Sequence, residues 1–141
     1  MSQTATISLT AKQVEQLTKI ARDALPNESC AFLLGESNAT TTTTTTVAEI
    51  LPMRNVDESE LSFSMEPQEV LHAYELAEKK GLQVIGIFHS HPGKPSPSRT
   101  DEKFMEINPV VWLIYSTTEG RLKAYMYDSD LSEVVIKVIT E

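Results

Sequence analysis

Two histidines separated by one residue have the clearest capacity for chemistry in this sequence. His89 and His91 end an apolar segment that begins at Val84, and Pro92 follows them directly. Side chains at positions i and i+2 of a strand point to the same face, so both imidazoles can reach one point. Two such nitrogens suit a tetrahedral zinc ion. A pair of partly exposed polar histidines that bind nothing is the plainer interpretation.

A carboxylate that could complete such a site follows the histidines. Two prolines stiffen the loop after His91, and Asp101 then falls early in a helix that we expect from Ser98 to Ile107. Two histidines and one carboxylate leave the fourth position of a zinc ion to water, the pattern of catalytic sites. Zinc-bound water can ionise near neutral pH and attack a carbonyl. Ser98 and Asp101 also form an ordinary S-x-x-D capping box, which needs no metal.

A site of this kind also needs a general base to move a proton from the water to the leaving group. Glu28 is our candidate, because it lies between Pro26, which ends a predicted helix, and an apolar segment that begins at Cys30. It would then project beside the sheet, although a glutamate in this position can simply face water. The third histidine, His72, falls inside a predicted helix, where we expect it to be structural or exposed.

Composition and charge limit the classes of function. The chain has 141 residues, 40% of them hydrophobic and 23% charged, which predicts one ordinary domain over residues 1–141. A net charge of −8 disfavours nucleic acid as a partner, and no apolar run is long enough for a membrane span. The N-terminus does not resemble a secretory signal, and the single cysteine suits a reducing compartment, so we expect a cytoplasmic protein.

Hydrophobic spacing predicts an α/β layer fold with much antiparallel pairing, because strands and helices do not alternate strictly. We expect helices from Thr10 to Leu25, from Pro67 to Lys80 and from Ser98 to Ile107, and strands over 5–9, 30–34, 84–89, 110–115, 122–127 and 134–139. The second helix should bury a stripe of Val70, Leu71, Tyr74 and Ala77. The threonine run from Thr40 to Thr46 favours one long strand that continues to Leu51, with a disordered insert as the alternative.

The segment from Gly86 to Asp101 resembles the JAMM (MPN+) motif of metal-dependent isopeptidases, H-[ST]-H-P followed by a serine and x-x-D. Upstream, the segment from Pro26 to Gly35 resembles the family's P-x-E segment before a buried strand, and the stretch from Asn55 to Pro67 follows the family's layout. The resemblance covers nearly the whole chain and is to compact archaeal or bacterial members. It implies an MPN domain, related in topology to cytidine deaminases, with a curved, mixed, largely antiparallel sheet flanked by helices.

The resemblance also implies roles for individual residues. Zn²⁺ would be bound by His89, His91 and Asp101. Glu28 would act as general acid and base on the zinc-bound water, and Ser98 would help to stabilise the oxyanion, usually a large electrostatic contribution.

One departure from the family pattern concerns the third ligand. The usual loop is one residue longer, so Glu102, eleven positions after His91, is an alternative to Asp101. We prefer Asp101 because it preserves S-x-x-D from Ser98.

A second departure from the family pattern lies in residues 116–121. They leave no room for a second insertion that positions lysine-linked chains in some relatives, so the sequence predicts no linkage selectivity.

The substrate implied by the resemblance is the amide after the C-terminal glycine of a ubiquitin-like modifier, whose tail docks extended along a sheet edge. The segment from Asn55 to Met65 occupies the place of an insertion that helps to hold that tail. Within it Ser62 and Phe63 are candidate contacts to the tail. The alternative is that Ser62 belongs to a plain turn and Phe63 to the core. Proteasome-type machinery and a helix-mediated homodimer would suit the family.

The sequence also bears on three other functions. A protease that trims a small sulfur-carrier protein would use the same chemistry, and the sequence does not separate the two. A non-catalytic MPN scaffold is a second class, but such relatives generally lack the ligands retained here. A zinc deaminase needs an H-x-E…P-C-x-x-C signature, which one cysteine excludes.

Overall fold

The strands in the described part of the chain form one mixed sheet, in the order β3-β1-β8-β7-β6-β5-β2-β4. The computed structural model describes residues 5–36, 44–57 and 64–140. The strands are β1 (Thr6–Thr10), β2 (Cys30–Gly35), β3 (Thr44–Thr46), β4 (Glu49–Met53), β5 (Gln83–His91), β6 (Val111–Ser116), β7 (Arg121–Asp128) and β8 (Asp130–Ile139). Strand β5 pairs parallel with β6, and β1 pairs parallel with β3 and β8, whereas the other pairings are antiparallel. The predicted mixed sheet is confirmed.

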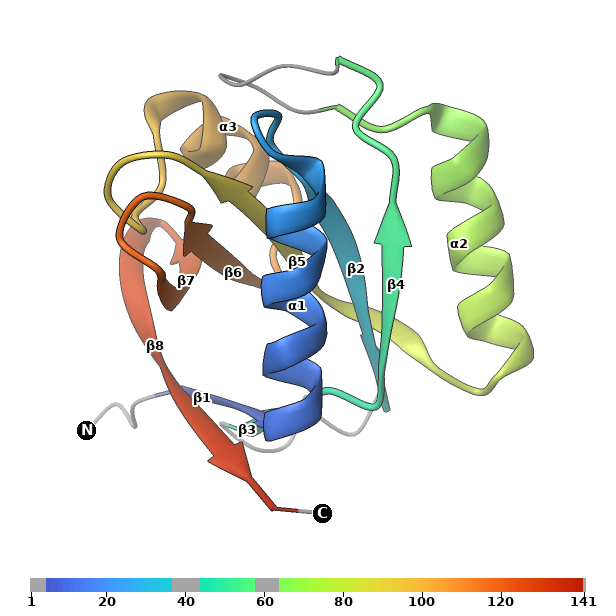
Figure 1. The fold of residues 1–141 in the computed structure, drawn as a ribbon. Helices are drawn as coiled ribbons and strands as arrows, with labels where there is room; N and C mark the ends of the chain where they lie inside the picture. The colour runs from blue at the N-terminus through green and yellow to red at the C-terminus, as the bar shows by residue number, and fades with distance from the viewer. Residues whose placement is uncertain (1–4, 37–43, 58–63, 141) are drawn as a thin grey trace.

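Three helices in the described ranges flank this sheet: α1 (Ala11–Ala24), α2 (Pro67–Lys79) and α3 (Arg99–Ile107). Thr10 caps α1, Pro67 occupies the first turn of α2, and Ser98 caps α3, all as predicted. Helix α1 lies over one face of the sheet, while α2 and α3 lie over the other (Figure 1). None of these helices combines the length and the apolarity needed to cross a bilayer.

The predicted long strand that would run to Leu51 is wrong. The threonine run ends in the short strand β3, and β4 begins only after a break at Val47 and Ala48. The two strands belong to opposite edges of the sheet, because β3 pairs with β1 and β4 pairs with β2. Strand propensity favours an extended chain in both segments but carries no information about their partners. Residues 40–43 of the run lie outside the described residues.

The break between β3 and β4 curls the sheet by joining its two edges. The Val47 N–H donates to the Ser8 carbonyl at 3.0 Å, and the Ala48 N–H donates to the Leu34 carbonyl at 2.8 Å. The backbones approach closely here, since a Cβ built on Gly35 would lie 2.5 Å from the Thr46 carbonyl oxygen. Glycine is therefore needed in β2 at this crossing.

Separate apolar cores cover the two faces of the sheet. On one face, α1 packs Leu17 and Ala21 against strand residues that include Leu33 and Phe88. On the other, Ala73 and Ala77 of α2 and Met105 of α3 pack against the sheet. The predicted stripe of α2 is therefore partly wrong: Leu71 is 62% exposed and Tyr74 48%, because the helix turns its two alanines toward the sheet.

Candidate active site

The face that carries α2 and α3 holds the candidate site, and strand register defines three rows of side chains across it. The apolar row runs Phe32, Ile87, Trp112 and Tyr125. The His89 row, one step further along β5, runs Cys30, His89, Ile114 and Lys123. The His91 row runs His91, Ser116 and Arg121. Since β5 and β6 are parallel, their C-terminal ends lie side by side, and the histidines lie at this end of β5.

The structure brings His89, His91 and Asp101 together, with one potential ligand atom of each within 4.8 Å of the others. The Asp101 Oδ2 atom lies 3.3 Å from His89 Nε2 and 3.8 Å from His91 Nε2. Ser98 orients this carboxylate, because its N–H donates to Asp101 Oδ2 at 2.8 Å and its hydroxyl accepts the Asp101 N–H at 3.1 Å. Glu102 is not part of the group that the described residues form.

The donors fit a zinc ion in chemistry and in spacing. Two ligand atoms about 2.0–2.1 Å from a tetrahedral ion lie about 3.3 Å apart, close to the separations of Asp101 Oδ2 from the two imidazoles. His91 Nδ1 lies 2.9 Å from the Pro92 carbonyl, and a proton on Nδ1 that donates to this carbonyl would leave the Nε2 lone pair to bind a metal. His91 Nε2 lies 3.1 Å from the Ser96 carbonyl, the contact that an ion would replace.

Glu28 is buried, with 6% of its surface exposed, and its Oε1 atom lies 3.7 Å from His89 Nδ1. Two serines on the opposite face attach its backbone to β5. The Ser29 N–H donates to Ser90 Oγ at 3.1 Å, the two hydroxyls lie 2.6 Å apart, and the Ser90 N–H donates to the Ser29 carbonyl. The carboxylate is therefore held beside the histidines and does not extend into solvent.

Asn55 is a residue of this site that sequence reasoning missed. Its Nδ2 donates to the Glu28 carbonyl at 3.0 Å, while its Oδ1 accepts the N–H groups of Asp57 and Ser64 at 3.0 and 3.1 Å. One amide thus ties the segment of Glu28 to both ends of the next loop. The available signal was an asparagine two residues after the end of a strand, because its amide can donate and accept at once. The candidates Ser62 and Phe63 lie outside the described residues.

The charges of the cluster favour a cation between its carboxylates. Burial alone would lower the pKa of His89, but the neighbouring carboxylates of Asp101 and Glu28 outweigh it and raise that pKa. Burial alone would raise the pKa of Asp101, but the hydrogen bonds and charge of His89, with those from Ser98, lower it. A proton and a divalent metal compete for the same imidazoles, so the cluster that raises the pKa of His89 also suits a metal.

Cys30 lies next to His89 in the same row but is not prepared for nucleophilic chemistry. Burial, followed by the charges of Glu69 and Glu28, raises the pKa of its thiol to about 12. The thiolate is the reactive form of cysteine, and it is scarce at neutral pH when the pKa is this high. The chemistry of the site therefore rests on its histidines and carboxylates.

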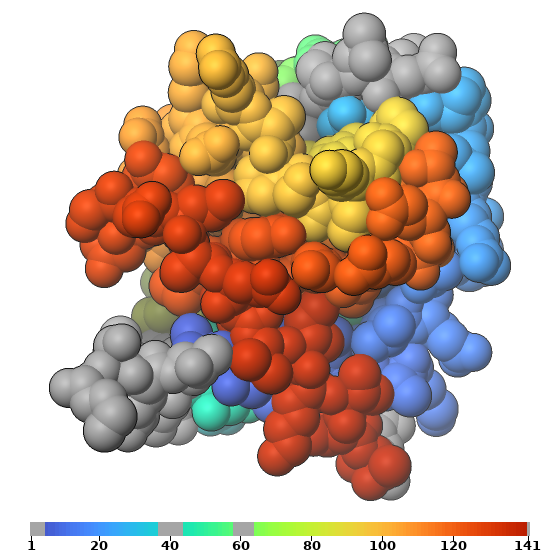
Figure 2. Space-filling view, turned by 90° about the vertical axis from the view of Figure 1, so that its left-hand side faces the viewer, coloured from blue at the N-terminus to red at the C-terminus, as the bar shows by residue number. Residues whose placement is uncertain are grey.

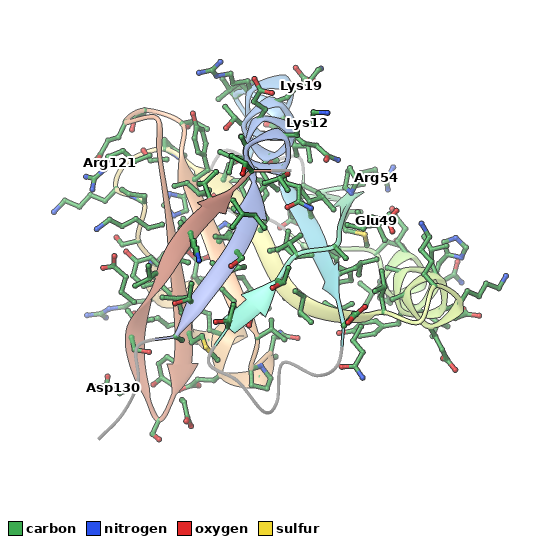
Figure 3. The ribbon with its side chains drawn as sticks, turned by 90° about the horizontal axis from the view of Figure 1, so that it is seen from below. Lys12, Lys19, Glu49, Arg54, Arg121 and Asp130 are labelled. Atoms are coloured by element: carbon green, nitrogen blue, oxygen red, sulfur yellow. The ribbon has the colours of Figure 1, made fainter. Side chains whose placement is uncertain are left out.

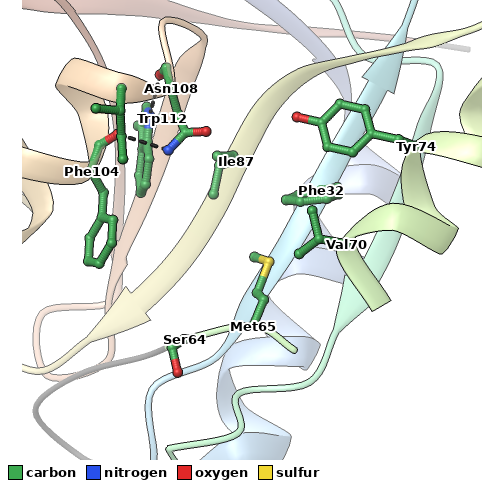
Figure 4. A pocket seen from close by; sticks show the side chains of 10 residues that line it. Phe32, Ser64, Met65, Val70, Tyr74, Ile87, Phe104, Asn108 and Trp112 are labelled. Carbon is green, nitrogen blue, oxygen red and sulfur yellow. Dashed lines mark hydrogen bonds between the residues drawn. The ribbon is translucent and has the colours of Figure 1, made fainter. Parts of the chain in front are cut away.

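An apolar cavity of about 300 Å³ lies on the same face of the sheet as the histidines, one row of side chains away from His89. Its floor is formed by three members of the apolar row, Phe32, Ile87 and Trp112. The Trp112 ring meets the His89 ring of the neighbouring row edge-on, with centroids 6.0 Å apart. Its walls come from α2, α3 and the segment before α2, including Tyr74, Phe104 and Met65 (Figure 4). Asn108 closes one end, where its carbonyl accepts the Trp112 indole N–H at 3.2 Å. The cavity can hold apolar side chains one row away from His89.

Comparison with known proteins identifies relatives of this chain. Residues 10–128 match the family described as prokaryotic homologs of the JAB domain. A desampylase of Pyrococcus furiosus is 36% identical over 115 residues, which cover 81% of this chain and 76% of that protein. A desampylase of Haloferax volcanii is 32% identical over 130 residues, covering 88% and 89%.

Solved structures agree on the fold. A protein of Desulfitobacterium hafniense superposes with a TM-score of 0.82 at 34% identity, over 96% of this chain and 94% of that one. A JAB1/MPN domain protein of Archaeoglobus fulgidus has a TM-score of 0.57 at 20% identity, covering 94% and 98%, and supports the fold alone. With the family matched over most of its length and two relatives above 30% identity, the chain belongs to the prokaryotic JAB-domain family of JAMM-type metallo-isopeptidases.

Proposed function

We propose that this protein is a zinc-dependent isopeptidase that cleaves the amide bond after the C-terminal glycine of a ubiquitin-like modifier. The observation that carries the proposal is the convergence of His89, His91 and Asp101 at the end of β5, with buried Glu28 beside them. Relatives named desampylases that match most of the chain support a substrate of this class.

The residues around the ion divide the chemistry between them. His89, His91 and Asp101 would hold Zn²⁺, which acts as a Lewis acid on water and on the scissile carbonyl when bound. Glu28 takes a proton from the attacking water and delivers it to the lysine nitrogen that leaves. Ser98 uses its hydroxyl lone pair to accept the Asp101 N–H, which leaves its O–H to donate to the developing oxyanion.

The apolar cavity supplies a place for the modifier's tail. It begins one row from His89, and Ser64 and Met65 on its rim belong to the segment expected to hold that tail. Apolar side chains a few residues before the terminal glycine would enter it, while the glycines pass the metal site. A cytoplasmic location, proteasome-type machinery and a homodimer stay predictions from the sequence.

A metal analysis tests the assignment of the ligands. We expect about one zinc per chain in the purified protein, and almost none in His89→Ala. His72→Ala is the matched control, because it removes an exposed imidazole from α2, and it should keep its zinc. Near-stoichiometric zinc in His89→Ala would refute the ligand set.

A cleavage assay tests the reaction itself. The protein is incubated with lysine conjugates of several ubiquitin-like modifiers and with linear fusions of sulfur-carrier proteins, with and without a zinc chelator, and products are read by intact mass. We expect chelator-sensitive cleavage after the terminal glycine of at least one lysine conjugate. Cleavage confined to the linear fusions would instead identify a processing protease.

A further inference from the structure

A second, cationic pocket lies on the other side of the loop that follows His91. It has a volume of about 230 Å³ and is lined by that loop, including Lys94, and by Glu119, Arg121, Lys123 and Tyr125. Figure 2 views the side of the molecule where α3, the segment after β5 and the turn between β6 and β7 come together. The residues assigned to the reaction do not include any of these side chains.

Strand register fixes the distance of this pocket from the histidines. Lys123 belongs to the His89 row and Arg121 to the His91 row, each two strands away on the same face of the sheet. Neighbouring strands lie about 4.8 Å apart, so the cationic side chains start about 10 Å from the imidazoles, across β6. The pocket is therefore a lateral neighbour of the candidate metal site.

The loop between the two sites is held firmly to the sheet. The Tyr125 hydroxyl donates to the Pro95 carbonyl at 3.1 Å, and the Gly93 N–H donates to Thr118 Oγ1 at 2.9 Å. The Ser116 hydroxyl donates to the Gly93 carbonyl. Since the Ser96 carbonyl lies 3.1 Å from His91 Nε2, the same loop contacts the candidate metal site and forms a wall of the pocket.

The charge of this pocket opposes that of the protein. Its lining carries three cations and one carboxylate in a chain of net charge −8. Arg121 contacts Glu119 at 3.5 Å and Lys123 contacts Glu133 at 3.7 Å, both long, exposed pairs of small value. Lys94 makes no ion pair with any residue in the ranges that the structure describes. A carboxylate from outside can therefore find a cation here without breaking a strong internal pair.

We propose that this pocket binds an acidic side chain of the protein that carries the modified lysine, about three residues from that lysine. The proposal rests on the proposed function and extends it to the acceptor side of the bond. The two halves of the scissile amide leave the metal site in different directions, and the apolar cavity on the α2 side suits the modifier's tail. An extended chain rises about 3.3 Å per residue, so about three residues span the 10 Å to the pocket.

The first test compares two lysine conjugates of whichever modifier the protein cleaves. One acceptor peptide carries glutamates three positions either side of the lysine and the other carries glutamines, and both peptides are C-terminally amidated. We expect a kcat/KM about fivefold higher for the acidic conjugate, mainly through KM, as one or two exposed ion pairs would give. At about 1 M salt, where the Debye length is about 3 Å, the ratio should approach one.

Charge-removing variants show whether the pocket is responsible. In the double variant Lys94→Gln, Arg121→Gln the acidic-to-neutral ratio should fall to about one. Lys19→Gln on α1 removes the same kind of charge away from the pocket and should keep the ratio (Figure 3). Equal cleavage of both conjugates by the unmodified protein, or an unchanged ratio in the double variant, would overturn the proposal.

A binding measurement separates failure of this proposal from failure of the proposed function. Fluorescence anisotropy of the two labelled acceptor peptides, without modifier, needs no turnover. If no conjugate is cleaved, tighter binding of the acidic peptide that the double variant abolishes would still support the pocket. Equal, weak binding of both peptides together with efficient cleavage of both conjugates would leave the isopeptidase intact and remove the acidic-residue site.

Discussion

The two faces of β5 differ in what they contribute, although their residues alternate along one strand. Phe88 points to the α1 face, where it is fully buried in an apolar core. His89 and His91 point to the other face, where α2 and α3 leave the apolar cavity between them. One helix completes the first face, whereas two separated helices leave room for a site on the second.

This difference shows how a small fold separates stability from chemistry. Successive residues of β5 point to opposite faces of the sheet. Phe88 therefore stabilises the sheet, whereas His89, the next residue, faces the candidate site. Ser29 and Ser90 illustrate the link between the faces, because their hydrogen bonds on the α1 side fix the backbone that carries Glu28 on the other. Substitutions on the two faces should therefore have different, separable effects.

Glu28→Gln should give the largest effect on activity. The amide keeps the size of the carboxylate but cannot take up a proton, so we expect kcat to fall about 10²–10⁴-fold while zinc content and melting temperature stay close to those of the unmodified protein. Glu15→Gln, an exposed position on α1, serves as the control. Full activity of Glu28→Gln in the conjugate assay would remove the general-base role.

Phe88→Ala should give the converse result on the opposite face. Truncating this fully buried ring removes apolar contacts and leaves a cavity, which typically costs about 3–5 kcal/mol of unfolding free energy. Zinc content and kcat/KM of the folded fraction should change little, as measured beside urea unfolding. Phe88→Leu, a smaller truncation, covers the case in which the alanine variant does not fold. Lost activity at unchanged stability would contradict the separation of the faces.

Asn55 connects the candidate site to the neighbouring loop, and its variants should lie between these extremes. Asn55→Ala removes the hydrogen bonds to Glu28, Asp57 and Ser64 and should cost about 1–3 kcal/mol of stability. Asn55→Asp keeps the two bonds that Oδ1 accepts but loses the one donated to the Glu28 carbonyl. If that bond positions Glu28, kcat falls in both variants while KM changes less. Normal kcat in Asn55→Asp would show that the tie is only structural.

The sequence predicted those parts of the fold that local chemistry determines. Helix starts at Thr10, Pro67 and Ser98 agree with the structure because capping depends on a few adjacent residues. The i, i+2 spacing of the histidines likewise predicted a shared face, since it follows from strand geometry. These features need no knowledge of distant partners.

The predictions were wrong, or were not made, for features that depend on residues distant in the sequence. The break at Val47 and Ala48 arises from hydrogen bonds to β1 and β2, on opposite sides of the sheet, which threonine's strand propensity does not reveal. Leu71 is exposed because of the rotation of α2 about its own axis, whereas the hydrophobicity of leucine alone suggested burial. The cationic pocket required the register of β5, β6 and β7, which brings Arg121 and Lys123 to the histidine face.

The pH dependence of stability should distinguish the metal-free site from the occupied one. The pKa of His89 is raised in the folded state, so its contribution is present below the ordinary value of 6.5 and is lost as pH rises through the folded pKa. The pKa of Asp101 is lowered, so its contribution is present above its ordinary 3.8 and is lost as pH falls through the folded pKa. Without metal, unfolding free energy should therefore fall as pH rises above about 6.5.

Zinc should reverse that trend, because it needs the neutral imidazole and its binding strengthens as protons leave. Urea unfolding between about pH 5 and 9, with chelator and with zinc, measures both cases. His89→Ala should flatten the metal-free decline and remove the response to zinc. A metal-free protein whose stability rises steadily over this range would contradict the raised pKa of His89.

Thiol modification should have the smallest effect, and it tests whether proximity to the histidines makes Cys30 reactive. Cys30 pairs with His89 across β2 and β5, yet its side chain is fully buried and burial raises its pKa to about 12. Alkylation under native conditions should leave both the thiol and the cleavage rate unchanged, whereas one equivalent reacts after unfolding in urea. Rapid native labelling that abolishes cleavage, with an unchanged melting temperature, would restore a cysteine mechanism and place the reactive thiol on the strand next to His89.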